Sequence, residues 1–398
     1  MLGIVKAKGA VLYDEQGKEY IDGISSWYTS MYGHCNDVII AKVYEQMQQL
    51  DQVVFSGFTH EPAIALSEAL ISLLPANQEK LFFSDNGSTS TEIGIKMALQ
   101  FHHNQGEKRS VLLAFEDGFH GDTFGAMSVS SLSVYNGPFE DYFIDVKRIP
   151  VPTEANMESL LHELENNIGL DAIAGFIYEP LVQGAAAMKM HKAEHLEKIL
   201  KVIKSHGVLA IADEVMTGFG KTGRHFASDY MEVKPDIICM SKALTAGMLP
   251  MAVTSCTKEV YDAFYSDDIA KGLFHGHTYT ANPLACAAAL AGIELLTSDE
   301  IQKNIGQIIQ WHQAFDAEIK DHPKVAATRQ TGIIYALDLN IVMERYGNVR
   351  DKLFKHFMDS GVFLRPLGNT IYILAPYITT KEQMQKIYNS IKEVLNSF

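Results

Sequence analysis

Short runs of apolar residues, separated by segments with helical periodicity, fill the middle of the chain. The apolar runs cover residues 80–84, 110–115, 172–178, 208–212 and 236–240. A helical pattern lies between some of them, most clearly at residues 193–205. Short strands that are apolar throughout and alternate with helices are typical of a parallel sheet covered on both faces. We therefore predict an α/β fold with a large, mostly parallel sheet.

The segment after the first apolar run has the pattern of a long helix. Thr89 and Glu92 have the spacing of a capping box, which predicts that the helix begins at Thr89. Ile93, Met97 and Phe101 follow at helical spacing on one face. We expect this face to pack on the sheet.

The two ends of the chain have a different pattern. Residues 11–21 read as a hairpin that turns at residues 14–17. The last hundred residues mix helices with short strands at residues 333–340 and 370–374. The ends therefore predict a smaller α+β domain beside the large sheet.

The composition excludes several classes of protein. Lysine and arginine number 33 against 48 aspartate and glutamate among 398 residues, and this net charge of −15 disfavours general binding to nucleic acid or anionic membranes. The start of the chain is too charged for a signal peptide, and no stretch reaches the roughly 18 apolar residues of a membrane span. The four cysteines lie too far apart to suggest a disulfide framework or a zinc cluster: Cys35, Cys239, Cys256 and Cys286. We expect a soluble, cytoplasmic protein that binds neither nucleic acid nor membranes.

Three short segments resemble known nucleotide-binding or metal-binding motifs, but the residues around them do not fit those motifs. Residues 218–223 match GxGxxG and the end of a P-loop, but no helical pattern follows and the first glycine of a P-loop is absent. His191 and His195 lack the glutamate of HExxH, so we expect an exposed helix face there. His275 and His277 have no third ligand nearby. We predict no metal site.

Three predicted strand ends carry polar residues suited to chemistry. Asp213 follows one apolar run, Lys242 follows the next, and residues 86–88 (Asn-Gly-Ser) join a strand to a helix. Ligands of parallel sheets bind beyond the carboxyl ends of the strands, so these groups should face one cleft. Each has a structural alternative: a helix cap or surface ion pair for Asp213, a snorkelling or paired amine for Lys242, and a simple N-cap for Asn86.

Together these groups fit pyridoxal phosphate (PLP). This cofactor needs an amine for a Schiff base, a carboxylate that keeps the pyridine nitrogen protonated, and a cradle for its phosphate. Lys242, Asp213 and residues 86–88 supply all three. Phe119 offers an aromatic ring to stack on the pyridine, and core packing is its alternative role.

The segments LAIADEVMTGFGKTG (209–223) and KPDIICMSKAL (234–244) strongly resemble the class III aminotransferases. The resemblance covers nearly the whole chain and implies a fold-type I PLP-dependent transferase that forms a homodimer with active sites at the interface. It implies a large domain at residues 25–298 and a small domain from residues 1–24 and 299–398. Lys242 then corresponds to the Schiff-base lysine and Asp213 to the partner of the pyridinium. The other implied cofactor contacts are Asn86, Gly87, Ser88, Phe119, His120 and Gln183, with His277 and Thr278 on a loop that would reach across the dimer.

Four further segments, at residues 22–28, 118–128, 179–184 and 361–368, are similar to the diaminononanoate synthases within this class. That resemblance implies transamination of 8-amino-7-oxononanoate in biotin biosynthesis, with S-adenosylmethionine as the amino donor. Aromatic walls and a guanidinium suit an alkyl chain that ends in a carboxylate. Packing of Trp27 and a structural ion pair of Arg365 are the alternatives. The implied substrate contacts are Trp27, Tyr28, Phe119, Asp122, Lys242, Gly276, Arg365 and Tyr372.

Other details bear on the substrates. Gly184 stands where ornithine and 4-aminobutyrate aminotransferases carry a glutamate, which disfavours those substrates. The synthases usually have tyrosine at Phe119, tryptophan at Tyr28, arginine at Lys221 and often proline at His277. Loss of the tyrosine hydroxyl removes a hydrogen bond worth about 1 kcal/mol.

The start of the sequence leaves two alternatives open. The synthase pattern begins with a tryptophan-histidine-proline-tyrosine run that contacts both substrates, and this sequence starts after it. Either the start is truncated or the substrate site is built differently. Lysine as the donor, a broad ω-amine:pyruvate aminotransferase, and a mutase or decarboxylase on the same fold are the alternative activities.

Overall fold

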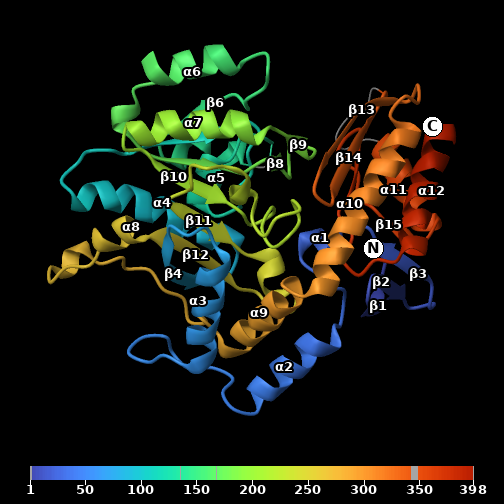
Figure 1. Cartoon of the computed structure of the whole chain (residues 1–398), viewed down its shortest axis with the longest axis horizontal. Helices are drawn as coiled ribbons and strands as arrows, with labels where there is room; N and C mark the ends of the chain where they lie inside the picture. Colours follow the sequence, from blue (N-terminus) through green and yellow to red (C-terminus); the bar gives the residue numbers. More distant parts are fainter. Residues whose placement is uncertain (1, 135, 167, 342–347, 398) are drawn as a thin grey trace.

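The larger part of the molecule is built on a seven-stranded sheet (Figure 1). The computed structural model describes residues 2–134, 136–166, 168–341 and 348–397. β12 runs antiparallel to both of its neighbours, and all other pairs are parallel, so the predicted mostly parallel sheet is confirmed. The apolar runs did not predict β6 and β12. In spatial order the strands are β4 (Gln78–Ser84), β12 (Ala252–Thr257), β11 (Ile237–Met240), β10 (Leu209–Asp213), β7 (Ile173–Tyr178), β5 (Val111–Phe115) and β6 (Val146–Ile149).

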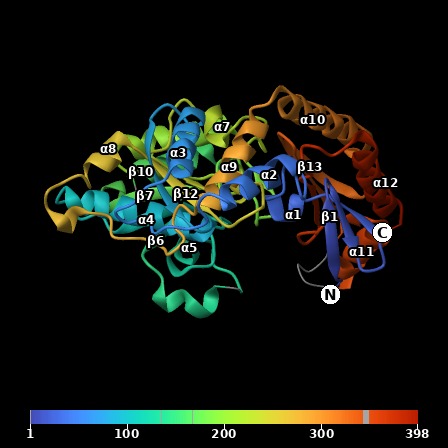
Figure 2. The same cartoon turned by 90° about the horizontal axis from the view of Figure 1, so that it is seen from below.

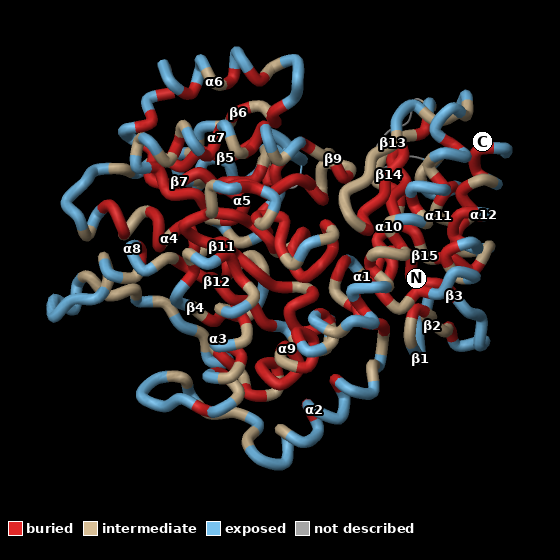
Figure 3. The backbone as a smooth tube through the Cα atoms, in the orientation of Figure 1, coloured by how far each residue is buried: buried red, intermediate tan, exposed pale blue. Residues whose placement is uncertain are grey.

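Helices cover both faces of this sheet, which explains why its central strands are apolar throughout (Figure 3). Ile211 of β10 packs in the cluster beneath α4 (Gly87–Asn104), whereas Ala212 packs in the cluster on the opposite face, with α7 (Ala193–Ser205). Ile93, Met97 and Phe101 of α4 are buried in the first cluster, as the helical pattern predicted.

The start of α4 corrects the sequence prediction. The N-cap is Asn86, whose Oδ1 accepts from the backbone N–H of Thr89 at 3.0 Å, while the Thr89 hydroxyl oxygen accepts from the N–H of Asn86 at 3.1 Å. Glu92 has another role, because its carboxylate accepts from the N–H groups of Gly125 and Ala126. The predicted capping box of Thr89 and Glu92 is therefore wrong by three residues. The Asn-Gly-Ser segment consequently lies at the first turn of the helix, the position that favours anions.

Strands from both ends of the chain pair in one small sheet. β15 (Val362–Phe363) runs parallel to β3 (Glu19–Asp22), which pairs with β2 (Val11–Asp14) in the predicted hairpin, and β1 (Ile4–Lys8) completes the sheet. The first strands and the last part of the chain consequently lie in the same part of the molecule (Figure 2). The domain boundaries at residues 24 and 298 stay a prediction. The other elements of this part are β13 (Val325–Thr331), β14 (Ile334–Leu339), β16 (Thr370–Ile373), α10 (Asp299–Ile319), α11 (Asn348–Asp359) and α12 (Lys381–Ser397).

The remaining helices surround the large sheet. α2 (Asp37–Met47) and α3 (Glu61–Leu73) both pack on α9 (Pro283–Leu296). None of the helices in the described ranges is both long and apolar enough to cross a bilayer. Shorter pieces are α1 (Ser25–Tyr28), α5 (Phe124–Val129), α6 (Met157–Asn166), α8 (Lys258–Asp262) and the small ribbon of β8 (Val182–Gln183) with β9 (Lys189–Met190).

The expectation of an exposed helix face at His191 and His195 is wrong. Both side chains are buried, and α7 begins after His191. His191 accepts a hydrogen bond from the backbone N–H of Leu181, and burial lowers its pKa to about 4. His195 pairs with Glu154 at 3.1 Å. The two histidines therefore serve packing rather than a solvated surface.

The turn between β13 and β14 lies in close backbone contact with the loop after β10. Gly332 has φ +57°, and a Cβ at this position would lie 2.2 Å from the carbonyl carbon of Thr222. The next residue, Ile333, donates its N–H to the carbonyl of Lys221 at 3.0 Å. A residue without a side chain is therefore required here.

Replacing Gly332 with alanine should lower the free energy of unfolding by about 3 kcal/mol or more, because the methyl group overlaps backbone atoms that cannot move aside. Urea denaturation measures the change. The matched control is Gly306→Ala in α10, where the added methyl meets no atom within 4 Å. That control should be neutral or stabilise by up to about 1 kcal/mol. Equal stability of the Gly332 variant and the parent would contradict the contact.

Candidate active site

A cavity of about 690 Å³ lies at the carboxyl ends of β10 and β11 and extends to the small sheets. It collects predicted site residues from both ends of the chain and from the middle. Of the predicted residues, twelve line it: Trp27, Tyr28, Asn86, Gly87, Ser88, Phe119, His120, Asp122, Asp213, Lys242, Arg365 and Tyr372.

Lys242 lies two residues beyond β11 in a strained backbone conformation. Its φ of +50° is uncommon for a residue other than glycine, asparagine or aspartate. Its Nζ lies 5.1 Å from the centroid of the Tyr28 ring and has no hydrogen-bond acceptor among the described residues. Burial lowers the pKa of Lys242, an effect that Asp213 and Glu179 oppose. The structure thus holds a desolvated amine that loses its proton more readily than a surface lysine does.

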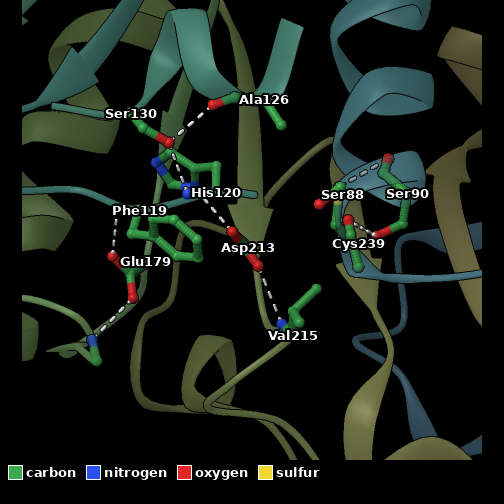
Figure 4. A network of polar contacts seen from close by, with 12 residues as sticks. Ser88, Ser90, Phe119, His120, Ala126, Ser130, Glu179, Asp213, Val215 and Cys239 are labelled. Atoms are coloured by element: carbon green, nitrogen blue, oxygen red, sulfur yellow. Dashed lines mark hydrogen bonds and ion pairs between the residues drawn. The ribbon is translucent and has the colours of Figure 1, made fainter. Parts of the chain in front are cut away.

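Asp213, the last residue of β10, is held between two partners. Its Oδ2 lies 2.7 Å from Nδ1 of His120, and its Oδ1 accepts from the N–H of Val215 at 3.1 Å (Figure 4). The backbone N–H of His120 donates to the Ser130 hydroxyl, which fixes the loop that carries the imidazole. A buried carboxylate held in this way can keep a proton on a basic nitrogen placed against it.

The neighbouring carboxylate has a structural role. Glu214 is fully buried and accepts from the N–H groups of Ala227 and Ser228 and from the hydroxyls of Thr217 and Ser228. It therefore organises the loop after β10. Of the two carboxylates that follow this strand, only Asp213 faces the cavity.

The first turn of α4 forms an open cradle. Its capping box leaves the N–H groups of Gly87 and Ser88 available, since the first N–H groups of a helix have no acceptor within it. A Cβ at Gly87 would lie 2.8 Å from Val215 Cγ1, and one at Gly121 would lie 2.1 Å from Ser88 Oγ. The glycines keep this corner small, so an anion can approach the positive end of the helix.

Glu179 is the main site residue that the sequence did not assign. It follows β7, lines the cavity and accepts from the N–H of Phe119 at 3.0 Å and from that of Gly184 at 2.9 Å (Figure 4). Burial raises its pKa to about 7. A carboxylate directly after a buried strand is the same signal that drew attention to Asp213. Glu179 therefore fixes the loop that carries the Phe119 ring.

The wall opposite Lys242 begins with a left-handed turn. Ser25, Ser26, Trp27 and Tyr28 have φ values of 49°, 46°, 69° and 74°. The left-handed conformation costs roughly 1–2 kcal/mol for each residue of this kind. The turn places the Tyr28 hydroxyl 3.2 Å from that of Tyr372.

A guanidinium completes this wall. The Arg365 guanidinium carbon lies 4.8 Å from the Trp27 ring centroid, so the two side chains stack. Arg350 of α11 also lines the cavity, and no local pattern in the sequence pointed to it. An apolar chain that ends in a carboxylate would match these groups.

Four predicted residues lie outside the cavity lining. Gln183 is fully buried, donates to the carbonyl of Glu116 and leaves its Oε1 without a partner in the described part of the chain. Gly276, His277 and Thr278 lie on the segment between α8 and α9, where His277 Nδ1 is 2.9 Å from Asp85 Oδ2. Their predicted contact with a second subunit stays a prediction. The described residues contain no group of three or more potential metal ligands.

Residues 1–395 match the family model for class-III aminotransferases. The chain belongs to the class-III aminotransferase family. Among curated class-III relatives, the adenosylmethionine-8-amino-7-oxononanoate aminotransferase of Synechococcus elongatus is 41% identical over 99% of this chain and 95% of its own length. The protein of that name from Helicobacter pylori is 33% identical over 100% of this chain and 92% of its own length.

Solved class-III structures have the same fold. The adenosylmethionine-8-amino-7-oxononanoate aminotransferase of Methanocaldococcus jannaschii is 31% identical, covers 99% of this chain and 93% of its own, and superposes with a TM-score of 0.91. A PLP-bound amine transaminase from an uncultivated Pseudomonas species is 27% identical, covers 100% and 95% of the two chains, and has a TM-score of 0.93. The predicted fold-type I architecture is therefore confirmed.

The residues of the cavity fit PLP, the cofactor of the class-III aminotransferases. Lys242 offers a desolvated amine, Asp213 a carboxylate fixed by His120, and the start of α4 a glycine-lined anion cradle. Phe119 is 44% exposed although it is aromatic, because its ring faces the cavity. The arrangement matches the three chemical requirements of this cofactor.

Lys221 carries a buried amine near the site. The side chain is fully buried, and its Nζ donates to the carbonyl of Gly218 at 2.8 Å. Burial and, to a lesser extent, the nearby Lys242 lower the pKa of Lys221 from its ordinary 10.5 to about 7, and Glu214 opposes the shift. Folding thus disfavours the protonated amine. The contribution of Lys221 to the stability of this class-III chain is therefore lost as the pH falls from about 10 to about 7.

Replacing Lys221 with methionine should raise the free energy of unfolding at pH 6 and remove the part of its increase between pH 7 and pH 10 that comes from Lys221, because this buried amine is no longer present to be protonated. Urea denaturation of the apoprotein across this range measures both effects. Lys234→Met is the control, because Lys234 is only partly buried and donates to the carbonyls of Ser228 and Met231. A parallel pH profile in the parent and the Lys221 variant would contradict this role of the buried amine.

Proposed function

We propose that this class-III aminotransferase uses PLP to transfer an amino group to 8-amino-7-oxononanoate, forming 7,8-diaminononanoate in biotin biosynthesis. The proposal rests on a single cavity that contains two groups of residues. Lys242 and Asp213 lie at its floor, and Arg365 stacks on Trp27 in its wall. The names of relatives that are up to 41% identical over nearly the whole chain support the same substrate.

The floor of the cavity supplies the reactive groups. PLP, when bound, withdraws electrons from the substrate carbon that loses its proton. Lys242 Nζ would hold the cofactor and, once a donor amine displaces it, move the proton at the donor α-carbon. A neutral amine is needed for this role, and burial favours it. Asp213 Oδ2, fixed by His120, would hold the proton on the pyridine nitrogen.

The wall of the cavity suits the acceptor. 8-Amino-7-oxononanoate has a reactive carbonyl separated from a carboxylate by an alkyl chain. Trp27 and Tyr28 provide aromatic surface for the chain, and Arg365 provides a guanidinium for the carboxylate. Gly184 lies beside Met216 and leaves no carboxylate at that position to pair with Arg365.

We propose S-adenosylmethionine as the amino donor, because adenosylmethionine is part of the names of the relatives. Lysine as the donor and a broad ω-amine:pyruvate activity are the alternatives. The similarity to an amine transaminase keeps the second alternative relevant. A donor–acceptor screen of the purified protein separates these possibilities.

The functional unit in this proposal is a homodimer. Phe274 and Tyr279, on the loop that carries Gly276 and Thr278, are largely exposed, as are Phe58 and Tyr265. Exposed aromatic side chains of this kind mark protein–protein interfaces. We propose that a second copy covers them and that Thr278 then contacts the cofactor phosphate of the other subunit, as the family resemblance implies. The cytoplasmic location inferred from the composition stays a prediction.

Replacing Lys242 with alanine should abolish transamination, by at least about 1000-fold, because the group that holds the cofactor and moves the proton is removed. The parent protein loaded with PLP should show a borohydride-reducible chromophore that leaves the cofactor covalently attached, and the variant should not. Lys204→Ala is the matched control, since Lys204 pairs with Asp236 just before β11. Full turnover by the Lys242 variant would refute its role.

Replacing Arg365 with alanine should raise the KM for 8-amino-7-oxononanoate about 10- to 100-fold, with kcat changed far less, because a charged hydrogen bond to the substrate is lost. The methyl ester of the acceptor should be equally poor for the parent and the variant. Arg224→Ala is the control, because Arg224 stacks on Tyr230 outside the cavity. An unchanged KM would show that the carboxylate binds elsewhere.

A further inference from the structure

The left-handed turn at Ser25–Tyr28 needs an explanation in contacts, because none of its four residues favours positive φ. The turn is nevertheless regular. The N–H of Tyr28 donates to the carbonyl of Ile24 at 2.9 Å, and that of Thr29 donates to the carbonyl of Ser25 at 2.9 Å. One turn of left-handed helix therefore carries two aromatic residues of the cavity wall. Contacts outside the turn must offset the unfavourable backbone conformation.

A buried aspartate supplies the first of these contacts. Asp22 ends β3 and has no exposed surface. Its Oδ1 accepts from the N–H of Ile24 at 3.2 Å, and its Oδ2 accepts from the hydroxyl of Ser26 at 2.9 Å. His34 Nε2 lies 2.8 Å from the same Oδ2. One carboxylate thus joins the residue before the turn, a residue within it and a histidine beyond it.

A second contact ties the turn to β16. The hydroxyl of Ser25 donates to the carbonyl of Leu374, directly after β16, at 2.7 Å, and the Tyr28 hydroxyl lies 3.2 Å from that of Tyr372 in β16. Ser25 is fully buried. The position of Trp27 therefore depends in part on groups outside the cavity lining, which are Asp22, Ser25 and Leu374.

We propose that Asp22 is a positioning residue that holds the left-handed turn and thereby sets the preference for an acceptor with an alkyl chain and a distal carboxylate. Without its carboxylate, the turn relaxes toward the right-handed conformation that serine, tryptophan and tyrosine prefer. Trp27 then leaves the Arg365 guanidinium, while Lys242 and Asp213 stay in place on the large sheet. The substrate part of this inference rests on the proposed function; the structural part does not.

A spectroscopic test needs no turnover. The chain has two tryptophans, so Trp311→Phe leaves Trp27 as the single tryptophan. In that background, Asp22→Ala should at least about double the fast component of the Trp27 fluorescence anisotropy decay, because the ring gains local motion. Asp14→Ala is the matched control: Asp14 is also buried at the end of a small-sheet strand and accepts from Gln16, Lys18 and Tyr20, away from the turn.

Glycine at position 26 distinguishes positioning from general destabilisation. Glycine adopts positive φ without a steric penalty, so Asp22→Ala/Ser26→Gly should restore the slow anisotropy decay. If Asp22→Ala only destabilised the fold, glycine at position 26 would not restore the slow decay. Asp22→Asn keeps an acceptor for the N–H of Ile24 and should lie between the parent and the alanine variant, which preserves the test if the alanine variant does not fold.

Kinetics test the consequence for specificity. Asp22→Ala should raise the KM for 8-amino-7-oxononanoate about tenfold and change the rate of the donor half-reaction less than about threefold, with partial recovery in the double variant. Unchanged anisotropy in both Asp22 variants would overturn the positioning role. Altered anisotropy with an unchanged acceptor KM would overturn the link to specificity. A parent protein that ignores 8-amino-7-oxononanoate would refute the proposed function and leave the anisotropy result standing.

Discussion

The parallel pairing of β10 with β11 sets the geometry on which the site depends. Asp213 lies directly opposite Cys239 in this pairing, so the two strands end at the same edge of the sheet. Lys242 follows three residues after Cys239 and reaches the same cavity as Asp213. A register shift of one residue would turn Asp213 to the opposite face of the sheet. The buried apolar faces of both strands make such a shift unfavourable, and they thereby hold a carboxylate and an amine in fixed positions.

Charge burial is the second constraint. Glu179 and Lys221 are buried near the cavity, and Lys242 is partly buried in its lining. Desolvation shifts the pKa of all three groups in the direction that favours the neutral form. Bound PLP would bring its own charges into this region. The apoprotein therefore lacks part of the compensation that its buried groups need, so cofactor binding should add to stability through linkage. The buried carboxylate of Glu214 is instead compensated within the protein, because it accepts four hydrogen bonds.

Much of the large sheet could be predicted because its strands are short apolar runs in the sequence and are buried on both faces in the structure. Apolar runs at 172–178 and 208–212 became β7 and β10, and the polar residues after the strands indicated the cleft. The capping box was misplaced because Thr89 and Glu92 have the right spacing, whereas Asn86 is the stronger N-cap and Glu92 instead accepts from the loop at Gly125.

The rest of the site depends on contacts between distant segments. Nothing in Ser-Ser-Trp-Tyr predicts a left-handed turn, because Asp22 and Leu374 impose it from outside. Arg350 reaches the cavity only because α11 packs beside β15. Both features belong to the part of the molecule assembled from the two chain ends. The contacts there join residues far apart in the sequence, so local sequence patterns do not predict them.

The proposed chemistry requires that the amine at the end of β11 holds the cofactor. Reduction of the PLP-loaded protein with borohydride, followed by peptide mass mapping of the modified lysine, tests this requirement directly. We expect a single label on Lys242. A label on Lys221, a fully buried lysine near the cavity, or on any surface lysine in place of Lys242 would contradict it.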